Sequence, residues 1–299
     1  MIMIRVDKNS AGVRVDKFLM QNYEVGFPLI QKLIRSKKIK INDRAIAKPI
    51  KIEVDDEVAI FADLKIRKIN EKPRDFVSQR KIDEFFSYKI FEDEHILAID
   101  KPSGLAVQGR SIARASIDDI LYNLKRQDIN LHLVHRIDRD TSGILLLAKN
   151  KKAAAMLNDH FKSKTITKTY QALLLGNLSK DEGVIDIPLK KKRVAGMEKV
   201  YPDVVNGDKA VSKYKLIKNY QDYCHVEMQP ITGRTHQLRV HAKEIGCPII
   251  GDFKYGGRKV IKKEIADRLC LHAAKINIAN YFGKILEIKA KIPDFMTKS

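Results

Sequence analysis

The chain has 299 residues, and 44% of them are hydrophobic, which is enough for a packed core and excludes a wholly disordered protein. Lysine and arginine number 57 against 37 acidic residues, and the net charge of +20 favours a polyanionic partner such as nucleic acid. Three cysteines without a CxxC pair argue against a disulfide framework or a zinc ribbon, and no apolar run has the length of a membrane span.

The first 60 residues have the pattern of a self-contained module. They lack the long apolar core of a signal peptide, so we expect an intracellular, cytoplasmic protein. Apolar residues at helical spacing predict one helix in VRVDKFLMQN and a second in PLIQKLIRS, where Pro28 suits the first turn. The segments KIKIND and EVAIF alternate like short strands.

A basic cluster lies on the second predicted helix and the strand after it. Between Leu29 and Lys51 there are eight basic residues and one acid, a net charge of +7 in 23 residues. Such a cluster is either a solvated surface or a nucleic-acid contact. The order RVDKFL, LIQKLIRSKKIKINDR, VDDEV resembles the S4 RNA-binding domain. The resemblance implies an S4-like domain over residues 1–62, with RNA-binding residues Lys32, Arg35, Lys37, Lys38, Lys40 and Arg44.

Residues 63–84 are charged, contain Pro73 and show weak periodicity, so we interpret them as a linker. From residue 85 onward, predicted strands are interspersed with a few helices. The segment YKIFEDEHILAIDKPSG predicts two strands around a turn, and SIDDILYNLKR predicts a short helix with Ser116 as its N-cap. The segment KKAAAMLNDHF predicts a further helix, and TKTYQALLLG returns as a strand.

The last third of the chain continues this pattern. AVSKYKLIKNYQDYCHVEMQP predicts a pair of strands, and GRTHQLRVHAKEIG predicts a helix that ends at Gly246. LHAAKINI and KILEIKAKIP predict a closing hairpin. We therefore expect an α+β fold in which residues 85–299 form one domain around a mostly antiparallel sheet.

Several common chemical motifs are missing from the sequence. It contains no GxGxxG or GxxxxGK[ST] phosphate loop, no HExxH and no GxSxG. His132 with His135, or His236 with His241, has the spacing of a metal pair, but no nearby third ligand completes a site. We expect neither a metal nor a cofactor.

The stretch LVHRIDRDTSGILLLAKN places five charged or titratable residues directly before an apolar run that is typical of a buried strand. One interpretation is a surface turn whose acidic and basic side chains pair with one another. The other is an active-site loop, because catalytic groups tend to lie on loops that a rigid scaffold holds. The fragment alone does not decide between them.

Three motifs in a fixed order resemble the RluA-type pseudouridine synthases. HRIDRDTSGILLLAKN is similar to the active-site motif of that family, with Ile137 where many members have leucine. KTYQALLLG is similar to the strand that bears an active-site tyrosine, and TGRTHQLRVHAKEIGCPIIGDFKYGG to the third motif. The resemblance covers nearly all of residues 85–295 and implies a pseudouridine synthase catalytic domain. It also implies an isomerase that needs no cofactor and acts on uridines in RNA.

The resemblance assigns roles to four residues. Asp138 would be the catalytic residue, and Tyr170 would stack on the uracil and help to remove its C5 proton. Arg234 would pair with Asp138, since a nearby cation lowers the pKa of a carboxyl group. Arg136 would enter the base stack as the target nucleotide leaves it. Asp140 lies outside the catalytic position and would serve the loop.

An S4 domain before the catalytic domain implies a large, structured RNA substrate. Side-chain choices in HRIDRDTSGILLLAK and GDKAVSKYKLI are most similar to the RluC type, which modifies 23S ribosomal RNA, with the RluD type as the alternative. A non-catalytic RNA-binding or ribosome-assembly protein that retains the fold is the competing class of function. We expect the protein to be a monomer.

Overall fold

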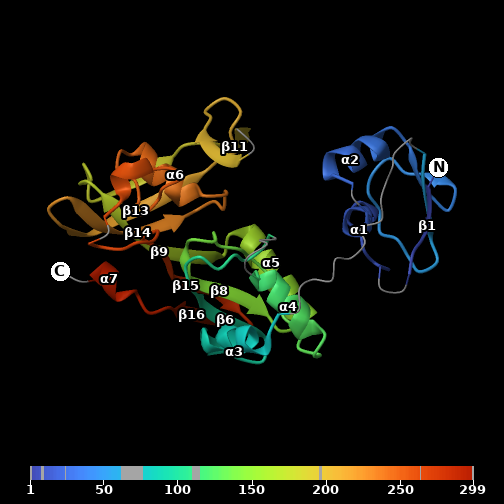
Figure 1. Cartoon of the computed structure of the whole chain (residues 1–299), viewed down its shortest axis with the longest axis horizontal. Coiled ribbons are helices and arrows are strands. Elements are labelled where there is room, and N and C mark those ends of the chain that lie inside the picture. Colours follow the sequence, from blue (N-terminus) through green and yellow to red (C-terminus); the bar gives the residue numbers. More distant parts are fainter. Residues whose placement is uncertain are drawn as a thin grey trace. The chain divides into compact units, whose positions relative to one another are not determined.

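The computed structural model describes residues 2–7, 10–23, 25–61, 77–109, 115–194, 197–262 and 264–297. The chain forms two compact units, Met1–Asp75 and Phe76–Ser299, which are described separately (Figure 1). Within the described residues, no helix is long and apolar enough to cross a membrane.

The first unit packs two helices against a small antiparallel sheet with the strand order β1-β4-β2-β3. Its elements are β1 (Ile2–Arg5), α1 (Val15–Asn22), α2 (Phe27–Arg35), β2 (Ile39–Ile41), β3 (Arg44–Ala45) and β4 (Glu57–Ile60). Phe18 and Leu19 of α1, Ile30 and Ile34 of α2, and Val58 of β4 share one buried core. Both predicted helices are confirmed, whereas strand β1 was not predicted because its four residues are too few to show a period.

The second unit is built on a large sheet with the path β10-β13-β14-β9-β15-β8-β6-β5, with β16 and β7 added beside β15 and β8. Its strands are β5 (Lys89–Glu92), β6 (Ile96–Lys101), β7 (His132–Leu133), β8 (Ser142–Ala148), β9 (Ile166–Leu175), β10 (Glu182–Asp186), β11 (Leu189–Val194), β12 (Met197–Pro202), β13 (Val211–Asn219), β14 (Tyr223–Pro230), β15 (Leu271–Tyr281) and β16 (Lys284–Lys289). Its helices are α3 (Gln79–Ser87), α4 (Ile117–Lys125), α5 (Lys151–Ser163), α6 (Gln237–Glu244), a 3-10 turn (Gly257–Val260) and α7 (Asp294–Thr297). Strands β11 and β12 form a separate hairpin. The predicted α+β class with a mostly antiparallel sheet is confirmed.

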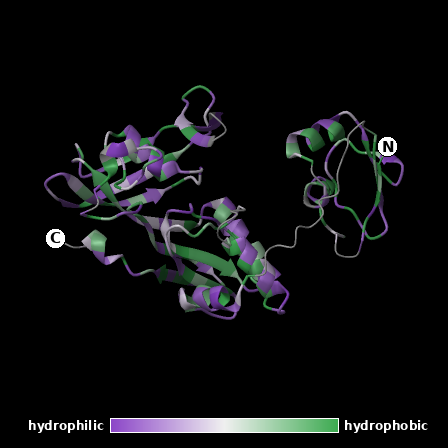
Figure 2. Cartoon of the chain, viewed as in Figure 1, coloured by the Kyte–Doolittle hydropathy of each residue, from purple (hydrophilic) through white to green (hydrophobic). Residues whose placement is uncertain are grey.

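Strand β8 is buried along its whole length because helices cover both of its faces. Ile144 and Leu146 pack with Leu157 of α5, whereas Leu145 and Leu147 pack in the core that α3 and α4 share. Burial on both faces explains why this strand is a continuous apolar run rather than an alternating one. Figure 2 shows β8 as a hydrophobic ribbon at the centre of this unit.

The predicted linker over residues 63–84 ends too late. Helix α3 begins at Gln79, and Val77 lies buried before it. Ile82 and Phe85, three residues apart on α3, enter the same core as Leu97 of β6. The charged residues between them hid this amphipathic helix, since its apolar face contains few positions. The part of the predicted linker before residue 77 lies outside the described residues.

The strand that follows the charged loop is fixed by one close backbone approach. Strands β8 and β15 pair in parallel at Ser142–His272 and Gly143–Ala273. Gly143 has φ +106°, and a Cβ there would lie 2.3 Å from the carbonyl oxygen of Ala273. Only glycine fits this position, because it has no Cβ and adopts positive φ readily. The end of the charged loop is thereby anchored to the middle of the sheet.

Candidate active site

The charged loop before β8 is held through its backbone. The Lys101 ammonium donates hydrogen bonds to the carbonyl oxygens of Pro102, Leu105 and Arg139, at 2.8, 2.8 and 2.9 Å. Ser103 Oγ donates to the carbonyl oxygen of Asp140 at 2.6 Å. Burial lowers the pKa of Lys101 to about 7, and the nearby carboxylates of Asp140 and Asp138 oppose this effect. The loop therefore rests on a buried lysine at the end of β6.

Asp138 projects from this loop toward helix α6. Its Oδ2 lies 3.5 Å from Arg239 Nη1 and 3.9 Å from His236 Nε2. Within the described residues its Oδ1 accepts no hydrogen bond, and a fifth of the side chain is exposed. One carboxylate oxygen thus lies near two side chains of the protein, and the other is available to contact a bound molecule.

Arg239 is locked by a second carboxylate. Its Nε and Nη2 donate to Asp252 Oδ2 and Oδ1, each at 2.8 Å, and both side chains are nearly inaccessible to solvent. Burial opposes the charge of Arg239, but the hydrogen bonds to Asp252 and the nearby Asp138 outweigh it, so its pKa is raised. Arg239 is a permanently charged group with a fixed orientation beside Asp138.

The predicted ion pair between Arg234 and Asp138 is wrong. Arg234 Nη1 lies 3.4 Å from Asp208 Oδ2, and its Nε donates to the carbonyl oxygen of Lys209 at 3.1 Å. The physical reason lies in the backbone: Arg234 precedes helix α6, whereas Arg239 lies inside the helix and faces the loop. Arg234 still lines the same cavity as Asp138.

A buried glutamine organises the turn before α6. Gln237 Oε1 accepts from Thr232 Oγ1 at 2.6 Å and from the backbone N–H of Arg234 at 3.0 Å. Its Nε2 donates to the carbonyl oxygen of Val211 at 2.8 Å and to Ser212 Oγ at 2.9 Å. All these groups are satisfied inside the protein, which fixes the turn that carries the neighbouring residue, His236.

A cavity of about 110 Å³ opens beside Asp138, the space of roughly four water molecules. This volume suits a single small ring. Tyr170 of β9 is nearly buried in its wall, and burial together with the neighbouring Asp138 raises the pKa of its phenol. Leu271 of β15 adds an apolar surface. The exposed Arg136 and the half-buried Lys168, whose pKa burial lowers, also line the cavity.

The remaining predicted loop residues have structural roles. Asp140 pairs with Arg139 at the surface, at 2.9 Å, as the surface-turn interpretation predicts for that pair alone. His135 Nε2 accepts the backbone N–H of Leu146 at 2.8 Å, and its ring stacks on Phe161. Within the described ranges, no three His, Cys, Asp or Glu side chains are grouped to hold a metal ion.

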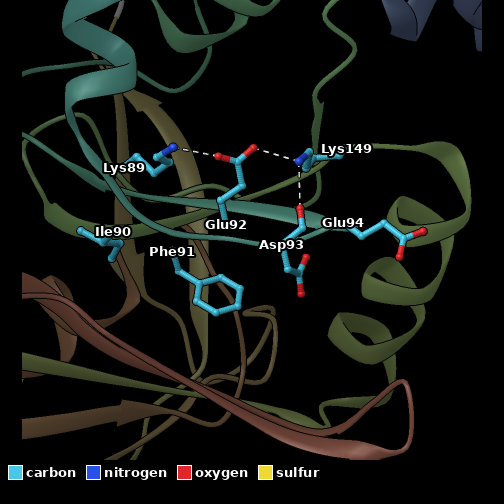
Figure 3. Close-up of a pocket in the computed structure, with 7 residues that line it drawn as sticks. All are labelled: Lys89, Ile90, Phe91, Glu92, Asp93, Glu94 and Lys149. Carbon is cyan, nitrogen blue, oxygen red and sulfur yellow. Dashed lines mark hydrogen bonds and ion pairs between the residues drawn. The ribbon is translucent and has the colours of Figure 1, made fainter.

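A larger hollow of about 600 Å³ lies at the edge strand β5 (Figure 3). Glu92 accepts hydrogen bonds from Lys89 at 2.9 Å and from Lys149 at 2.8 Å, and Lys149 also donates to the carbonyl oxygen of Asp93. These contacts tie β5 to the end of β8. The hollow lies apart from Asp138 and from the cavity beside it, so it is not part of the candidate active site.

Sequence reasoning missed Lys101, His236, Arg239, Asp252 and Tyr255 as members of this site. The strongest available signal was the spacing of His236 and Arg239, which puts both on one face of the predicted helix. Asp252 and Tyr255 are likewise three residues apart, but only the fold brings them to α6.

The chain is similar to several proteins of a known family. A model of the RNA pseudouridylate synthase family matches residues 95–244. The chain is 36% identical to "Ribosomal large subunit pseudouridine synthase C" of Rickettsia bellii, over 99% of this chain and all of that protein. It is also 36% identical to the protein of the same name from Vibrio parahaemolyticus, over 91% and 87% of the two chains.

The solved structure of "Human RNA Pseudouridylate Synthase Domain Containing 4" matches with a TM-score of 0.60 at 27% identity, over 73% of this chain and 93% of that one. These matches confirm the predicted relationship to RluA-type synthases and the predicted isomerase class. The chain therefore belongs to the RNA pseudouridylate synthase family.

Proposed function

We propose that this protein converts uridines to pseudouridines in the 23S RNA of the large ribosomal subunit, with Asp138 as its catalytic residue. The full-length relatives named as large-subunit pseudouridine synthase C support this substrate. They favour the RluC type over the RluD type, which stays the alternative for the sites that are modified.

The observation that carries the proposal is the free Oδ1 of Asp138 at a cavity of about 110 Å³. The cavity accommodates one base, so the target uridine must leave its helix or lie in a loop, at a cost of a few kcal/mol. Arg239 holds the opposite oxygen, Oδ2. A preorganised carboxylate in a partly water-excluded site is what attack on, or proton removal from, a ribose requires.

The reaction balances without a cofactor. The C1′–N1 bond of the uridine breaks, the uracil turns within the pocket, and a C1′–C5 bond forms. C5 loses a proton and N1 gains one, so no electron is gained or lost overall. A glycosidase usually needs a second carboxyl group to protonate its leaving group. Uracil leaves as a stabilised anion, so the single carboxylate of Asp138 suffices.

Two cavity residues, Tyr170 and Arg136, are assigned to handling the base in this proposal. Tyr170 lies in the wall, where its aromatic face can stack on the uracil. Because its pKa is raised, the phenol stays neutral at neutral pH and is a weak proton acceptor, which favours stacking over proton removal from C5. Arg136 is exposed at the rim, where its guanidinium can fill the space that the base leaves.

The first unit supplies an S4-like RNA-binding surface in this proposal. Lys32 and Arg35 lie in the last turn of α2, and Lys37 and Lys38 lie in the turn that follows. Lys40 lies on β2 above the ring of Phe61. Within the described part of the chain, no carboxylate forms an ion pair with the six residues Lys32, Arg35, Lys37, Lys38, Lys40 and Arg44. These cations are available to phosphate groups.

The test is site-mapped pseudouridine formation in protein-free 23S RNA transcripts. D138N keeps the shape of the side chain and removes its charge, and we expect it to bind RNA normally and convert no uridine. D159N is the control for loss of a carboxylate charge, since Asp159 lies exposed on α5 and pairs with Lys162 at 3.8 Å, and it should keep wild-type conversion. Full activity of D138N would refute the assigned role.

The mapped sites then separate the RluC type from the RluD type. If the wild-type protein binds the transcripts and converts nothing, the assay is repeated on assembling ribosomal particles. A second failure would identify the protein as a non-catalytic RNA-binding or assembly factor.

A further inference from the structure

His236 lies beside Asp138, and the proposed mechanism gives it no role. It stands at the N-terminal end of α6 with φ +53° and ψ +20°, a left-handed conformation that costs a non-glycine residue about 1 kcal/mol or more. Its side chain is largely enclosed, and its Nε2 lies 3.9 Å from Asp138 Oδ2. A strained residue at an active site indicates that its position matters to the chemistry.

Tyr255 determines which nitrogen of His236 carries the proton. The phenol oxygen accepts the backbone N–H of Val200 at 3.2 Å and lies 2.6 Å from His236 Nδ1. Within the described residues, Nδ1 is the only acceptor for the phenol hydrogen, so Tyr255 donates to it. Burial raises the pKa of Tyr255 to about 12, which keeps that hydrogen in place. A neutral His236 must then carry its proton on Nε2, which faces Asp138.

The charges around His236 keep its ring neutral. Burial lowers its pKa to about 4, and the cations Arg239 and Lys254 act in the same direction. The carboxylates of Asp138 and Asp252 oppose this effect without reversing it. At neutral pH, His236 therefore offers one N–H to Asp138 and adds no charge to the site.

We propose that His236 is a positioning residue for Asp138: its Nε2–H, directed by Tyr255, fixes Oδ2 together with Arg239 and leaves Oδ1 to face the ribose of the target uridine. This inference rests on the proposed catalytic role of Asp138. The distance of 3.9 Å is longer than a hydrogen bond. The proposed role therefore requires the two side chains to approach to about 3 Å when RNA fills the cavity. Arg239 and His236 approach the same oxygen, so the carboxylate cannot rotate to exchange Oδ1 for Oδ2.

Two amides of different length test this role in the full-length protein. H236Q places an amide nitrogen near the position of Nε2 and can donate to Asp138. H236N reaches only the position of Nδ1, so it can meet Tyr255 but not Asp138. Single-turnover conversion of the 23S transcript at saturating enzyme gives the rate of the chemical step. Filter binding gives the RNA Kd, and thermal unfolding checks the fold.

We expect H236N to slow the single-turnover rate by about 10- to 100-fold, with Kd changed less than about twofold. H236Q should restore the rate to within about fivefold of the wild type. Y255F should slow the wild-type protein several-fold and have no further effect in the H236N background, because the donor is already lost. Equal rates for H236N and H236Q, whether both full or both low, would overturn the inference.

D138N separates the two proposals. If D138N converts uridines at the wild-type rate, the proposed catalytic role fails, whatever the His236 variants do. If D138N is inactive while H236N keeps the full rate, only the role of His236 fails.

Discussion

Arg239 and Asp252 form a buried, two-bonded ion pair, with both N–O distances at 2.8 Å, directly behind Asp138. The pair orients Arg239 so that its remaining nitrogen, Nη1, faces the catalytic carboxylate. A lysine keeps the charge but cannot donate in two directions at once. We expect R239K to lower the single-turnover rate about 100-fold and to destabilise the protein by about 2 kcal/mol.

The comparison for this variant is R234K, at the arginine that sequence reasoning had placed beside Asp138. Arg234 is 44% exposed and pairs with Asp208, so its replacement should slow the reaction several-fold less than R239K. A larger loss in R234K than in R239K would contradict the arrangement of the two arginines. Single-turnover rates and urea unfolding of both variants decide the matter.

Lys101 supports the catalytic loop through the loop's backbone. Its replacement should disturb the position of Asp138 but leave RNA binding unchanged. K101M keeps most of the volume but leaves three carbonyl oxygens without their donor, at a cost of about 2 kcal/mol or more in unfolding free energy. We expect a loss of about tenfold in the single-turnover rate with an unchanged RNA Kd. S103A removes one hydrogen bond to the same loop and should cost only about 1 kcal/mol. A K101M protein with the wild-type rate would show that the loop keeps its position without Lys101.

Gly143 should tolerate no side chain. G143A places a Cβ against the Ala273 backbone in a conformation with positive φ, so β8 and β15 must separate. We expect a loss of at least about 3 kcal/mol in unfolding free energy, or no folded protein. Gly283 also has positive φ, but a Cβ added there would meet no atom within 4 Å, so G283A should cost only about 1 kcal/mol. Similar unfolding midpoints for the two variants would argue against the close approach.

Buried neutral histidines should make the protein less stable in mild acid. Burial lowers the pKa of His135 to about 3 and that of His272 to about 4, below the ordinary value of 6.5. Below pH 6.5 these histidines bind protons in the unfolded chain but stay neutral in the folded chain. The free energy of unfolding therefore falls as the pH falls, until the pH reaches the pKa of the folded state. Each histidine contributes up to about 1.4 kcal/mol per pH unit in this window.

H135Q tests this linkage, because a glutamine oxygen can accept the Leu146 N–H that His135 accepts, without titrating. Urea unfolding between pH 7.5 and 5 should show a shallower loss of stability for H135Q, by about 2 kcal/mol at pH 5. Parallel stability curves for the two proteins would show that His135 does not control the acid response.

The basic cluster of the first unit should act on RNA affinity and not on the chemical step. Replacing Lys32, Arg35 and Lys37 by glutamine should weaken RNA binding and lower the slope of log Kd against log salt by about 0.7 to 0.9 per lost phosphate contact. The single-turnover rate at saturating enzyme should stay within about twofold. The matched control replaces the exposed Lys151, Lys152 and Lys162 of α5, which carry the same charge. Equal losses of affinity in both triple variants would refute a specific role for the cluster.

Local signals in the sequence were sufficient for elements with strong periodicity or caps. Helix α4 begins at Ile117, and Ser116 before it accepts the N–H of Asp119 and completes a capping box, as the predicted N-cap requires. Strand β8 was evident from its unbroken apolar run. The hairpin of β11 and β12 was not predicted, because its run of four basic residues, 190–193, hides any alternation. Helix α3 was not predicted for the same reason, because the charged residues around it obscure its apolar spacing.

The predicted active-site residues illustrate the limit of local reasoning. The motifs identified Asp138 and Tyr170, and the fold brings both to one cavity. The choice between Arg234 and Arg239 depends on where helix α6 begins relative to the loop, which is a tertiary property. The support from Lys101 and Asp252 comes from segments far from the loop in the sequence, so no local pattern could reveal it.

The attachment of the catalytic loop through its backbone has a consequence for evolution. Lys101 and Ser103 donate hydrogen bonds to the backbone carbonyl oxygens of Arg139 and Asp140. Every amino acid has such a carbonyl group. This attachment does not depend on which side chains stand at 139 and 140, whereas it does depend on the lysine at 101. Substitutions at these two positions of the loop can therefore accumulate while the backbone that carries Asp138 keeps its place.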